Sequence, residues 1–454
     1  MIINVQNYFD IDKKEQFAEF AQQKAKGKIL TNPKLLNKEE RRLYVRDTLR
    51  EDHRFRIENN PESAKEKFDK LSDSSFKFFR GTSLIFYRDY SGEDNCYPIV
   101  FTIGDVHPEN FGVMPNENDV PFFSVNDFDE AYFAPFTYDI KRGVTGFYLA
   151  AKANGFKKKK RDKITTSFVK GYIEGLEEFA KDDREKWHQY RIDNSPKLIK
   201  KLLKKSIKSK RDFLAKSIDL DKECFLISKK VVPLTKEVEN FQKVIDEYVK
   251  ENEIAIKDDN YFKVLDVAVR KGSGTASLGL NRFWILIKGL GDDVEQDAIL
   301  EMKQARPSAL KGLIPEKVEK EIESAQHIVQ AHNTHLVGGD RFYGFAYYED
   351  KEYIIRERSR FKNEIDLEDL GFKDFVDYAF ICGKTLSQTH ARSDEDTGIM
   401  EGNAEEKILA SFFPQVFIDD MRRFAKQAAK RVEKDFKHFK KDHKMDAFNI
   451  STKA

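Results

Sequence analysis

Two short β-prone runs, each followed at once by acidic residues, constrain this sequence more than any other feature. Residues 97–103 (YPIVFTI) and 121–125 (PFFSV) are rich in β-branched and aromatic side chains, as expected of buried strands. The first run leads into residues 104–112 (GDVHPENFG) and the second into residues 126–130 (NDFDE). Acidic groups in the loops that follow strands are well placed for function, because a rigid scaffold positions them. We therefore expect a mixed sheet whose strand ends carry a polar site.

The spacing of these polar residues suits phosphoryl transfer. Asn110 follows Asp105 by five residues, and Asp127 comes just after the next strand. A carboxylate can orient an attacking hydroxyl and accept its proton, and Mg²⁺ prefers a few carboxylate or amide oxygens together with phosphate. We predict these three residues as the catalytic set, with Asp105 as the base and Asn110 and Asp127 as Mg²⁺ ligands.

The same segments resemble motifs of known enzymes. Residues 104–110, with the pattern G-D-x-H-P-x-N, resemble the catalytic loop of aminoglycoside phosphotransferases and other kinase-like enzymes. Residues 126–129 (NDFD) resemble their metal-binding segment, and residues 135–142 (PFTYDIKR) resemble the helix that follows it. The resemblance implies an ATP- and Mg²⁺-dependent phosphotransferase in which Asp139 holds the catalytic loop.

A wider pattern, which includes residues 79–81 (FRG), is closer still to a family of bacterial proteins labelled domain of unknown function 2252. This resemblance extends from about Lys67 to about Ser393, and is specific in the motifs and loose between them. The implied fold class is α+β, a protein-kinase-like two-lobed fold. Arg80 in this pattern has two interpretations: it contacts a phosphate, or it forms an ion pair with Asp127 or Asp129.

A second group of segments predicts a nucleotide-binding small lobe. Residues 261–270 and 281–288 have the character of strands, and the loop between them contains Gly272, Ser273, Gly274 and Gly279. Glycines let the backbone approach an anion closely and direct its N–H groups toward it, although many hairpins also carry glycine. Residues 298–305 are expected to form a third strand, whose apolar run ends in Lys303. In kinase-like small lobes a lysine on such a strand reaches the nucleotide phosphates.

The carboxylate partner of Lys303 is left open by the sequence. A helix is expected to start near residue 315, and several of its side chains are candidates: Glu319, Glu321, Glu323 and Gln326. Residues 341–357 predict a hairpin that turns at residues 349–351. Its exit places Arg356 where the hinge of a kinase-like enzyme would meet adenine, so we count Arg356 with the nucleotide-binding residues.

The order of these parts differs from that of the enzymes they resemble. Residues 375–389, followed by His390, resemble the helix that immediately precedes the catalytic loop in aminoglycoside phosphotransferases. Here that loop lies near residue 105, so the catalytic loop comes first and the glycine-rich lobe second. We interpret this order as a circular permutation, which proteins tolerate when the new termini lie at the surface.

The permuted arrangement divides the chain into five expected parts. They are an N-terminal helical segment (1–75), the catalytic-loop and metal-segment part of the large lobe (76–181), a helical insertion or cap (182–258), the glycine-rich small lobe (259–360), and the helical remainder of the large lobe with a C-terminal helix (361–454). Residues 76–87, which are rich in phenylalanine, are expected to be strand-like. In the tail, apolar residues at helical spacing predict a helix that docks on the protein.

Composition excludes several classes of protein. The 454 residues carry a formal net charge of only +2, so nucleic acid is not expected as a partner, and the basic runs at residues 157–161 and 200–211 are interpreted as solvated helix faces. Three scattered cysteines predict a reducing compartment. No apolar run of about 18 residues occurs, so we expect a cytoplasmic protein with no membrane contact.

Several alternatives stay open. Transfer of a nucleotidyl instead of a phosphoryl group would use the same fold. A nucleotide-binding pseudokinase would instead work as a scaffold through its basic helical insertion. A metallophosphoesterase could also begin with Asp105-x-His107, but it needs further histidine segments, and His332 and His335 have the wrong spacing. The acceptor, small molecule or protein, and the oligomeric state are not determined by the sequence.

Overall fold

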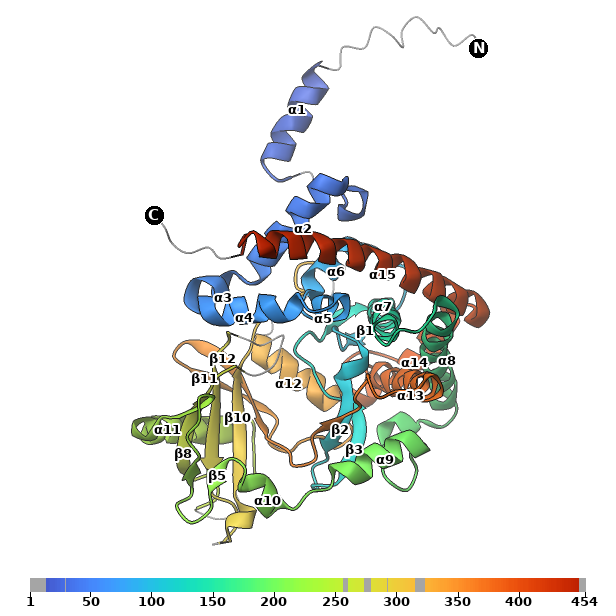
Figure 1. The fold of residues 1–454 in the computed structure, drawn as a ribbon. Coiled ribbons are helices and arrows are strands. Elements are labelled where there is room, and N and C mark those ends of the chain that lie inside the picture. Colours follow the sequence, from blue (N-terminus) through green and yellow to red (C-terminus); the bar gives the residue numbers. More distant parts are fainter. Residues whose placement is uncertain are drawn as a thin grey trace, which may run out of the picture.

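A six-stranded antiparallel sheet forms one half of the molecule (Figure 1). The architecture comes from a computed structural model that describes residues 14–28, 30–255, 260–272, 279–291, 293–314 and 323–448. The strand order is β11-β12-β10-β9-β8-β7. The strands are β7 (Val231–Pro233), β8 (Val264–Arg270), β9 (Arg282–Ile287), β10 (Ala298–Gln304), β11 (Gly344–Tyr348) and β12 (Lys351–Glu357).

Periodicity located most of this sheet. The strands predicted at residues 261–270, 281–288 and 298–305 are β8, β9 and β10, which are consecutive neighbours. The predicted hairpin is β11–β12. Its two loop residues, Glu349 and Asp350, have φ values of 49° and 56°. Two consecutive residues with positive φ make the tight turn whose twist matches that of the flanking strands.

Two smaller sheets carry the acidic segments. β1 (Ile99–Thr102) pairs with β4 (Tyr132–Pro135), while β2 (Phe111–Pro115) lies between β3 (Pro121–Val125) and β13 (Asn363–Glu364). The runs predicted as strands before residues 104 and 126 are therefore β1 and β3. A separate short hairpin is formed by β5 (Ile218–Asp219) and β6 (Cys224–Phe225).

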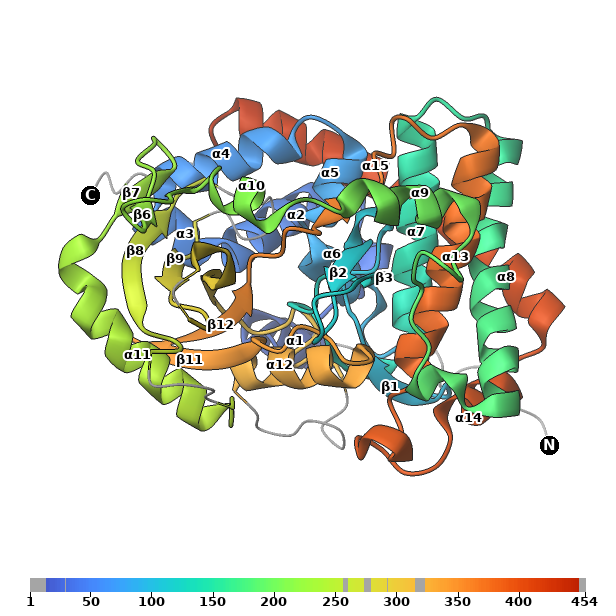
Figure 2. The same cartoon turned by 90° about the horizontal axis from the view of Figure 1, so that it is seen from below.

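Three long helices build the other half of the molecule. α7 (Thr137–Ala153), α8 (Lys158–Asp182) and α13 (Phe372–Ala391) lie side by side (Figure 2) and bury apolar faces in one large core with β1–β4. A second core lies between α11 (Val238–Glu251) and the six-stranded sheet. α12 (Ser324–His335) contacts β11, β12 and α13. The fold is thus mixed α+β, with two main hydrophobic cores.

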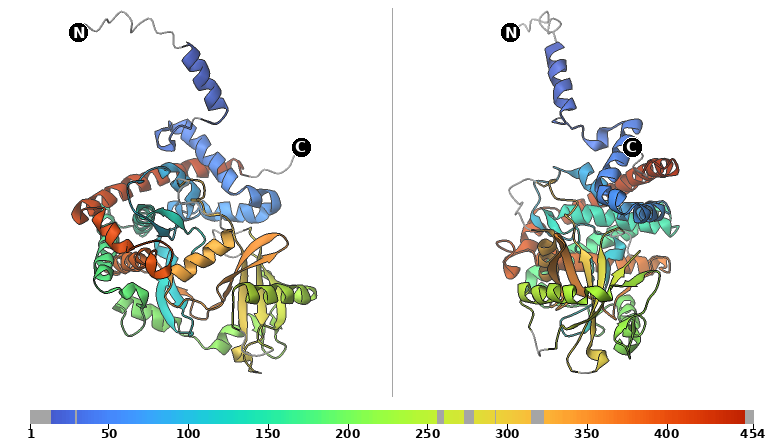
Figure 3. Two further views of the ribbon diagram at one scale, coloured as in Figure 1. Left: turned by 180° about the vertical axis from the view of Figure 1, so that it is seen from behind. Right: turned by 90° about the vertical axis from the view of Figure 1, so that its left-hand side faces the viewer.

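The N-terminal and C-terminal helices meet over the large core. α15 (Pro414–Lys444) follows α14 (Ala404–Ala410) and crosses α7, α8, α5 and α2, whereas α1 (Lys14–Ala25) projects from the body (Figure 3). The predicted docking face of the tail is confirmed, because Phe417, Met421 and Phe439 are buried. The remaining helices of this region are α2 (Lys38–Asp52), α3 (Arg54–Asn59), α4 (Pro61–Leu71), α5 (Ser75–Arg80) and α6 (Ser83–Tyr90).

Two segments differ from expectation. Residues 76–87, predicted to be strand-like, belong to helices α5 and α6. The Ser74 hydroxyl accepts a hydrogen bond from the N–H of Lys77, and Phe76 and Phe79, one turn apart, are both buried in the large core. The segment 182–258 contains α9 (Lys197–Ser206), α10 (Lys210–Leu214) and α11, but also three strands, of which β7 is an edge strand of the main sheet.

The α8–α13 contact depends on glycines. A Cβ at Gly383 of α13 would lie 2.0 Å from the carbonyl oxygen of Phe168 in α8, and one at Gly171 of α8 would lie 2.0 Å from the carbonyl oxygen of Phe380. Backbone atoms cannot move aside as a flexible side chain can. The two helices therefore approach so closely that no side chain fits at either position.

We expect Gly383→Ala to force α8 and α13 apart and to lower the free energy of unfolding by about 3 kcal/mol, the range of severe overpacking. Thermal or urea unfolding followed by circular dichroism measures the loss. Lys170→Ala, at an exposed position of α8, is the control and should unfold like the wild type. Equal stability of the two variants would contradict the close approach of the helices.

Candidate active site

The segment after β1 is held by a buried carboxylate. Asp139 of α7 accepts hydrogen bonds from the N–H of Ile103 (2.7 Å, Oδ2) and from the N–H of Gly104 (3.0 Å, Oδ1). Its Oδ2 also lies 3.0 Å from Nε2 of His390, and the Tyr172 hydroxyl lies 2.7 Å from Nδ1 of the same ring. Burial raises the pKa of Asp139, while His390 and the two N–H groups lower it. Asp139 thus holds this segment, as predicted.

Gly104 itself cannot be replaced by a larger residue without a backbone shift. Its φ is +87°, and a Cβ there would lie 2.0 Å from the carbonyl oxygen of Glu130. This conformation and this close contact both require glycine. As a result, the chain turns sharply at the end of β1 and brings Asp105 next to the segment that follows β3.

Asp105 is oriented by an arginine one turn beyond Asp139. Arg142, which is fully buried in α7, donates from Nε to Oδ1 of Asp105 at 2.8 Å and from Nη2 to the carbonyl oxygen of Phe79 at 2.8 Å. The Phe79 ring supports the guanidinium at 3.8 Å. The second oxygen, Oδ2, lies 3.8 Å from Nε2 of His107. One carboxylate oxygen is therefore fixed, and the side chain lines a cavity.

The predicted metal ligands line that same cavity. Asn110 donates from Nδ2 to the carbonyl oxygen of Asp105 at 2.6 Å, which leaves its side-chain oxygen for another contact. Asp127 accepts a 3.3 Å hydrogen bond from the N–H of Asp129. Burial and the negative charge of Asp129 raise the pKa of Asp127, with Lys303 and Arg356 opposing. The structure therefore brings together Asp105, Asn110 and Asp127, as the sequence predicted.

Lys303 comes to this site from the six-stranded sheet. Its Nζ forms an ion pair with Asp129, a residue that lines the cavity. Burial would raise the pKa of Asp129, but Lys303 reverses this effect and lowers it. Glu323 and Gln326, which were candidate partners of Lys303, instead contact the Tyr347 hydroxyl. Glu319 and Glu321 lie outside the described residues. The carboxylate that pairs with Lys303 is thus on the acidic segment.

Arg80 has a different partner from those considered. It forms an ion pair with Glu109 and donates from Nε to Nε2 of His107 at 3.3 Å. The alternative of an ion pair with Asp127 or Asp129 is therefore wrong. Arg80 nevertheless lines the cavity with Asp105, so its predicted contact with a phosphate stays a prediction.

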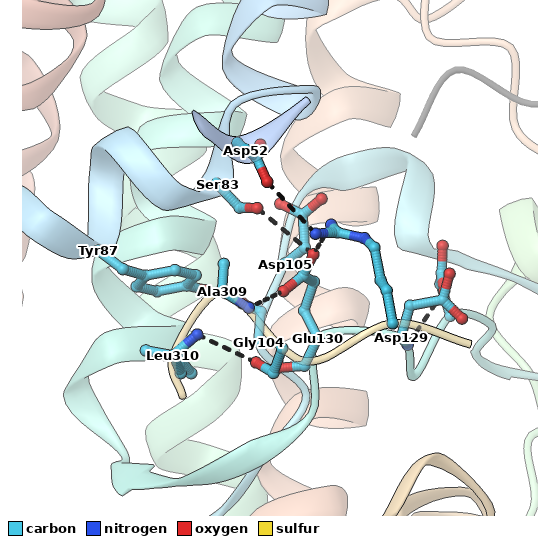
Figure 4. Close-up of polar contacts among 12 residues, drawn as sticks. Asp52, Ser83, Tyr87, Gly104, Asp105, Asp129, Glu130, Ala309 and Leu310 are labelled. Carbon is cyan, nitrogen blue, oxygen red and sulfur yellow. Dashed lines mark hydrogen bonds and ion pairs between the residues drawn. The ribbon is translucent and has the colours of Figure 1, made fainter. Parts of the chain in front are cut away.

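A second ion-pair network, shown in Figure 4, was missed by sequence reasoning. Glu130 accepts a hydrogen bond from the N–H of Ala309 at 2.6 Å and pairs with Arg306, which also lies 3.5 Å from Asp52. Burial raises the pKa of Glu130 to about 7, although Arg306 and the Ala309 N–H lower it. Arg306 lies three residues beyond Lys303, and this short separation was the only sequence feature that could have suggested Arg306 as a site residue. Nothing in the sequence pointed to Asp52.

The ends of the glycine-rich loop lie against the N-terminal helices. Gly272 and Gly279 have φ values of +63° and +85°, while Ser273 and Gly274 lie outside the described residues. A Cβ at Gly279 would lie 3.1 Å from Cγ of Arg56 in α3. Leu280, the next residue, lines the cavity together with Asp105. The loop end and the acidic segments therefore face the same space.

Lys67 of α4 also lines this cavity and is 2% exposed. Burial lowers its pKa strongly, and the nearby Arg56 adds to this effect while Asp52 opposes it. The cavity itself has a volume of about 20 Å³, room for one water molecule. Side chains of both halves and of the N-terminal helices fill the rest of the space.

A second, larger cavity has a volume of about 560 Å³. Asn126, the neighbour of Asp127, lines it, and so does Arg356 of β12. Arg356 is bonded to Glu301, a β10 residue two positions before Lys303, with Nη2 to Oε2 at 2.8 Å. The volume of this larger cavity falls within the range of small-molecule sites, which is about 300–1,000 Å³. A ligand larger than water therefore fits here and not in the small cavity as it stands.

The histidines of α12 are packed as core residues. The ring of His332 stacks on Tyr343 at 3.9 Å, and that of His335 stacks on Phe128 at 6.1 Å. Burial lowers their pKa values to about 4 and about 3. Within the described part of the chain, no three His, Cys, Asp or Glu side chains are grouped so as to hold a metal ion.

Comparison with known proteins gives one match. The family model described as "Uncharacterized protein conserved in bacteria (DUF2252)" matches residues 59–442. The chain belongs to this family. The match begins within α3 and ends within α15. In this DUF2252 protein, Asp52 and Arg56 therefore lie outside the matched region, and the other residues of the site lie inside it.

No curated protein and no solved structure matches the chain. None of the helices that the structure describes in this DUF2252 protein is both long and apolar enough to span a bilayer.

The raised pKa of Glu130 predicts a pH-dependent stability difference. Between pH 4.5 and about 7 the folded protein retains a proton that the unfolded chain releases, so wild-type stability falls relative to Glu130→Gln as the pH rises through this window. The full change is about 3 kcal/mol. Urea unfolding at several pH values measures it, with Glu62→Gln, an exposed site, as the control. If the stability difference between the wild type and Glu130→Gln did not change with pH, the raised pKa of Glu130 would be wrong.

Proposed function

We propose that this protein is an ATP- and Mg²⁺-dependent phosphotransferase that acts on a hydroxyl acceptor. One observation carries the proposal: Asp105, Asn110 and Asp127 line one cavity, and Lys303, which is far away in the sequence, reaches the same cavity through Asp129. A base, two oxygen ligands for Mg²⁺ and a lysine for the phosphates are the parts that kinase-like phosphoryl transfer needs.

Several contacts support a circularly permuted, kinase-like arrangement of the two lobes. Lys303 lies on β10, the third of three consecutive antiparallel strands, and the β8–β9 loop ends at the cavity that contains Asp105. The end of α13 lies beside β1, since the Ser393 hydroxyl donates to the carbonyl oxygen of Phe101 at 3.1 Å. His390 meets Asp139 nearby. This is the neighbourhood expected if a connection between α13 and β1 had been cut and new termini made elsewhere. In this proposal β7 and α11, which fall in the segment predicted as a helical insertion or cap (182–258), belong to the small lobe because they pair with and pack on its sheet.

The chain's own residues fit the roles assigned to them. Arg142 fixes Oδ1 of Asp105, so that Oδ2 can accept a proton from the acceptor hydroxyl as its oxygen bonds to the γ-phosphorus of ATP and the bond from that phosphorus to the bridging oxygen breaks, which releases ADP. The neighbouring His107 stays neutral, because burial lowers its pKa well below the usual value, followed by the charges of Arg80 and Arg142. A neutral imidazole does not compete with Asp105 as a cation.

Asn110 and Asp127 fit a Mg²⁺ site. The Asn110 side chain uses its nitrogen for the Asp105 carbonyl, which leaves the amide oxygen, and the raised pKa of Asp127 shows a carboxylate that an added cation would stabilise. When bound, Mg²⁺ neutralises charge on the transferred phosphoryl group and on the leaving group. Lys303 and the end of the glycine-rich loop would hold the remaining phosphates.

Binding of a triphosphate requires local rearrangement. The small cavity holds about one water molecule, so the Lys303–Asp129 and Arg306–Glu130 ion pairs must open to admit phosphates. Arg356 lines the larger cavity, and its predicted contact with the nucleotide stays a prediction. Opening is favourable when each lysine or arginine exchanges a carboxylate for a phosphate oxygen.

Two further candidates use the same site. Nucleotidyl transfer would place the α-phosphate, and not the γ-phosphate, next to Asp105. A nucleotide-binding scaffold would need Lys303 but would not need Asp105 as a base. Arg142 serves to orient Asp105, a feature that binding alone does not require, and this favours a catalyst. A metallophosphoesterase is disfavoured because the α12 histidines are packed against aromatic rings.

The deciding experiment is incubation of the protein with Mg²⁺ and ATP labelled at either the α- or the γ-phosphate, together with pools of small molecules and proteins. Transfer of the γ-label supports the phosphotransferase, and transfer of the α-label supports nucleotidyl transfer. Binding of ATP without transfer of either label indicates the scaffold. No binding at all would overturn the proposal.

Asp105→Asn is expected to abolish transfer and leave ATP affinity nearly unchanged, because the base acts on the acceptor and not on the nucleotide. Turnover of labelled ATP and calorimetric ATP binding give the two readouts. Asp73→Asn, at an exposed position, is the matched control. If Asp105→Asn weakens ATP binding as much as turnover, Asp105 is a metal ligand and the assignment is wrong.

Lys303→Met should have the opposite signature and chiefly raise the Kd for ATP. Loss of one charge-assisted contact to phosphate is worth about 1.5–3 kcal/mol, or roughly ten- to a hundredfold in affinity. Calorimetry with ATP and Mg²⁺ measures the change, and Lys263→Met, which is exposed just before β8, is the control. Unchanged affinity in Lys303→Met would remove Lys303 from the site.

A further inference from the structure

The larger cavity has an unusual balance of charge. Of the described residues that line it, seven are Lys or Arg and four are Asp or Glu. The cavity is lined by residues of β2, β9, β10 and β12 and of the segment that follows β12. A surplus of cations at a partly buried site is costly unless an anion is bound there.

The carboxylates of the cavity are largely committed to other contacts. Glu301 pairs with both Arg282 and Arg356, at 3.0 and 2.8 Å. Asp340 accepts hydrogen bonds from two backbone N–H groups, those of Phe342 and Glu357. These two acidic groups therefore pair with Arg282 and Arg356 or cap the backbone, and among the described residues they form no ion pair with the other cations of the cavity.

Two arginines lack such compensation. Among the described residues, Arg270 and Arg358 have no carboxylate within 4 Å: Arg270 donates to the carbonyl oxygens of Lys230 and Lys271, and Arg358 donates to the Ser217 hydroxyl. Burial lowers the pKa of Arg358 to about 10; Glu301 opposes this, and Arg270 and other arginines add to it. Burial also lowers the pKa of Arg270; Arg282 adds to this effect and Glu301 opposes it.

Both guanidinium groups lie over one aromatic ring. The Trp284 indole of β9 is 7% exposed, and its centroid lies 3.6 Å from Cζ of Arg358 and 5.0 Å from Cζ of Arg270. The ring holds the two planar cations beside the cavity. Lys362, which lies 3.8 Å from Glu364, adds a third positive group; its pKa is lowered by burial first and then by Arg356, and Glu364 opposes this.

We propose that this cavity binds a small molecule that carries two or more phosphate groups, with Arg270 and Arg358 as its principal ligands. A phosphate brings up to two negative charges and three acceptor oxygens, and the planar guanidinium fork matches it. A single carboxylate would leave part of the positive charge without a partner. The volume of about 560 Å³ accommodates a ligand of nucleotide size.

The proposal goes beyond the phosphotransferase activity, because it concerns binding at residues outside the catalytic set. The phosphates have two possible sources: the nucleotide itself, or a separate phosphorylated molecule that serves as acceptor. The two sources share one chemistry, and the experiment separates them.

The chain offers a built-in probe. It contains two tryptophans, Trp284 in the cavity and Trp187, whose exposed fraction is 67%. In a Trp187→Phe background, Trp284 is the sole source of tryptophan fluorescence. Titration of this full-length protein with inorganic tripolyphosphate should give a saturable fluorescence change, which sodium chloride at matched ionic strength does not reproduce. Absence of saturation at millimolar tripolyphosphate would overturn the proposal.

Variants then locate the site. Arg270→Gln and Arg358→Gln should each weaken tripolyphosphate binding about tenfold or more. Arg423→Gln, on the exposed face of α15, removes the same charge elsewhere and should leave the affinity unchanged. Calorimetry supplies the affinities, because Arg358 touches Trp284 and its loss alters the fluorescence itself. Thermal unfolding checks that each variant is folded. Equal affinities in all three variants would place the anion elsewhere and overturn the proposal.

A competition experiment identifies the source of the phosphates. If ATP displaces tripolyphosphate competitively, the nucleotide's own phosphates occupy the cavity; if both bind at once, the occupant is a separate phosphorylated molecule. Either result supports the proposal. None of these measurements requires turnover, so a protein that binds tripolyphosphate through Arg270 and Arg358 but transfers no label would refute the phosphotransferase and leave this site standing.

Discussion

The buried carboxylate of Asp139 is the interaction on which the rest of the site depends. It is fully buried, and yet it accepts two backbone N–H groups and faces the His390 ring, so its negative charge is stabilised by fixed partners. A buried carboxylate without such partners would take up a proton or destabilise the fold. Because α7 carries both Asp139 and Arg142, one helix face sets the backbone after β1 and the orientation of Asp105. Through His390, the same carboxylate ties α13 to β1.

Around this fixed centre the structure balances opposite charges contributed by distant segments. Lys303 meets Asp129, Arg306 meets Glu130 and Asp52, and Arg282 and Arg356 meet Glu301. Such pairs are stable in a poorly hydrated site only when each charge is matched. They are also exchangeable, since a phosphate can replace a carboxylate at each lysine or arginine. The network is thus compatible with a closed resting state that an anionic ligand opens.

The N-terminal helices contribute side chains to the site itself. Arg56 packs at Gly279, Lys67 lines the small cavity, and Asp52 lies near Arg306. A strongly desolvated lysine such as Lys67 is tolerated where it serves a function or is held by neighbours. Access to the acidic residues is therefore controlled from three directions: the six-stranded sheet, the α7 region and helices α2 to α4.

The sequence by itself determined the local features. Strand periodicity located β1, β3, β8, β9 and β10, the apolar spacing in the tail predicted the docking face of α15, and motif spacing identified Asp105, Asn110 and Asp127. These features depend on residues a few positions apart. Residues 76–87 were misjudged because phenylalanine-rich runs suit strands as well as helices, and the Ser74 cap and the packing on α7 decided for helix. Only the tertiary structure decided which charges pair. Three features depend on how distant segments meet: the pairing of Lys303 with Asp129, the Glu130–Arg306–Asp52 network, and the absence of an ion-pair partner for Arg270 and Arg358 among the described residues. Contacts between residues far apart in the sequence leave no periodic pattern in it.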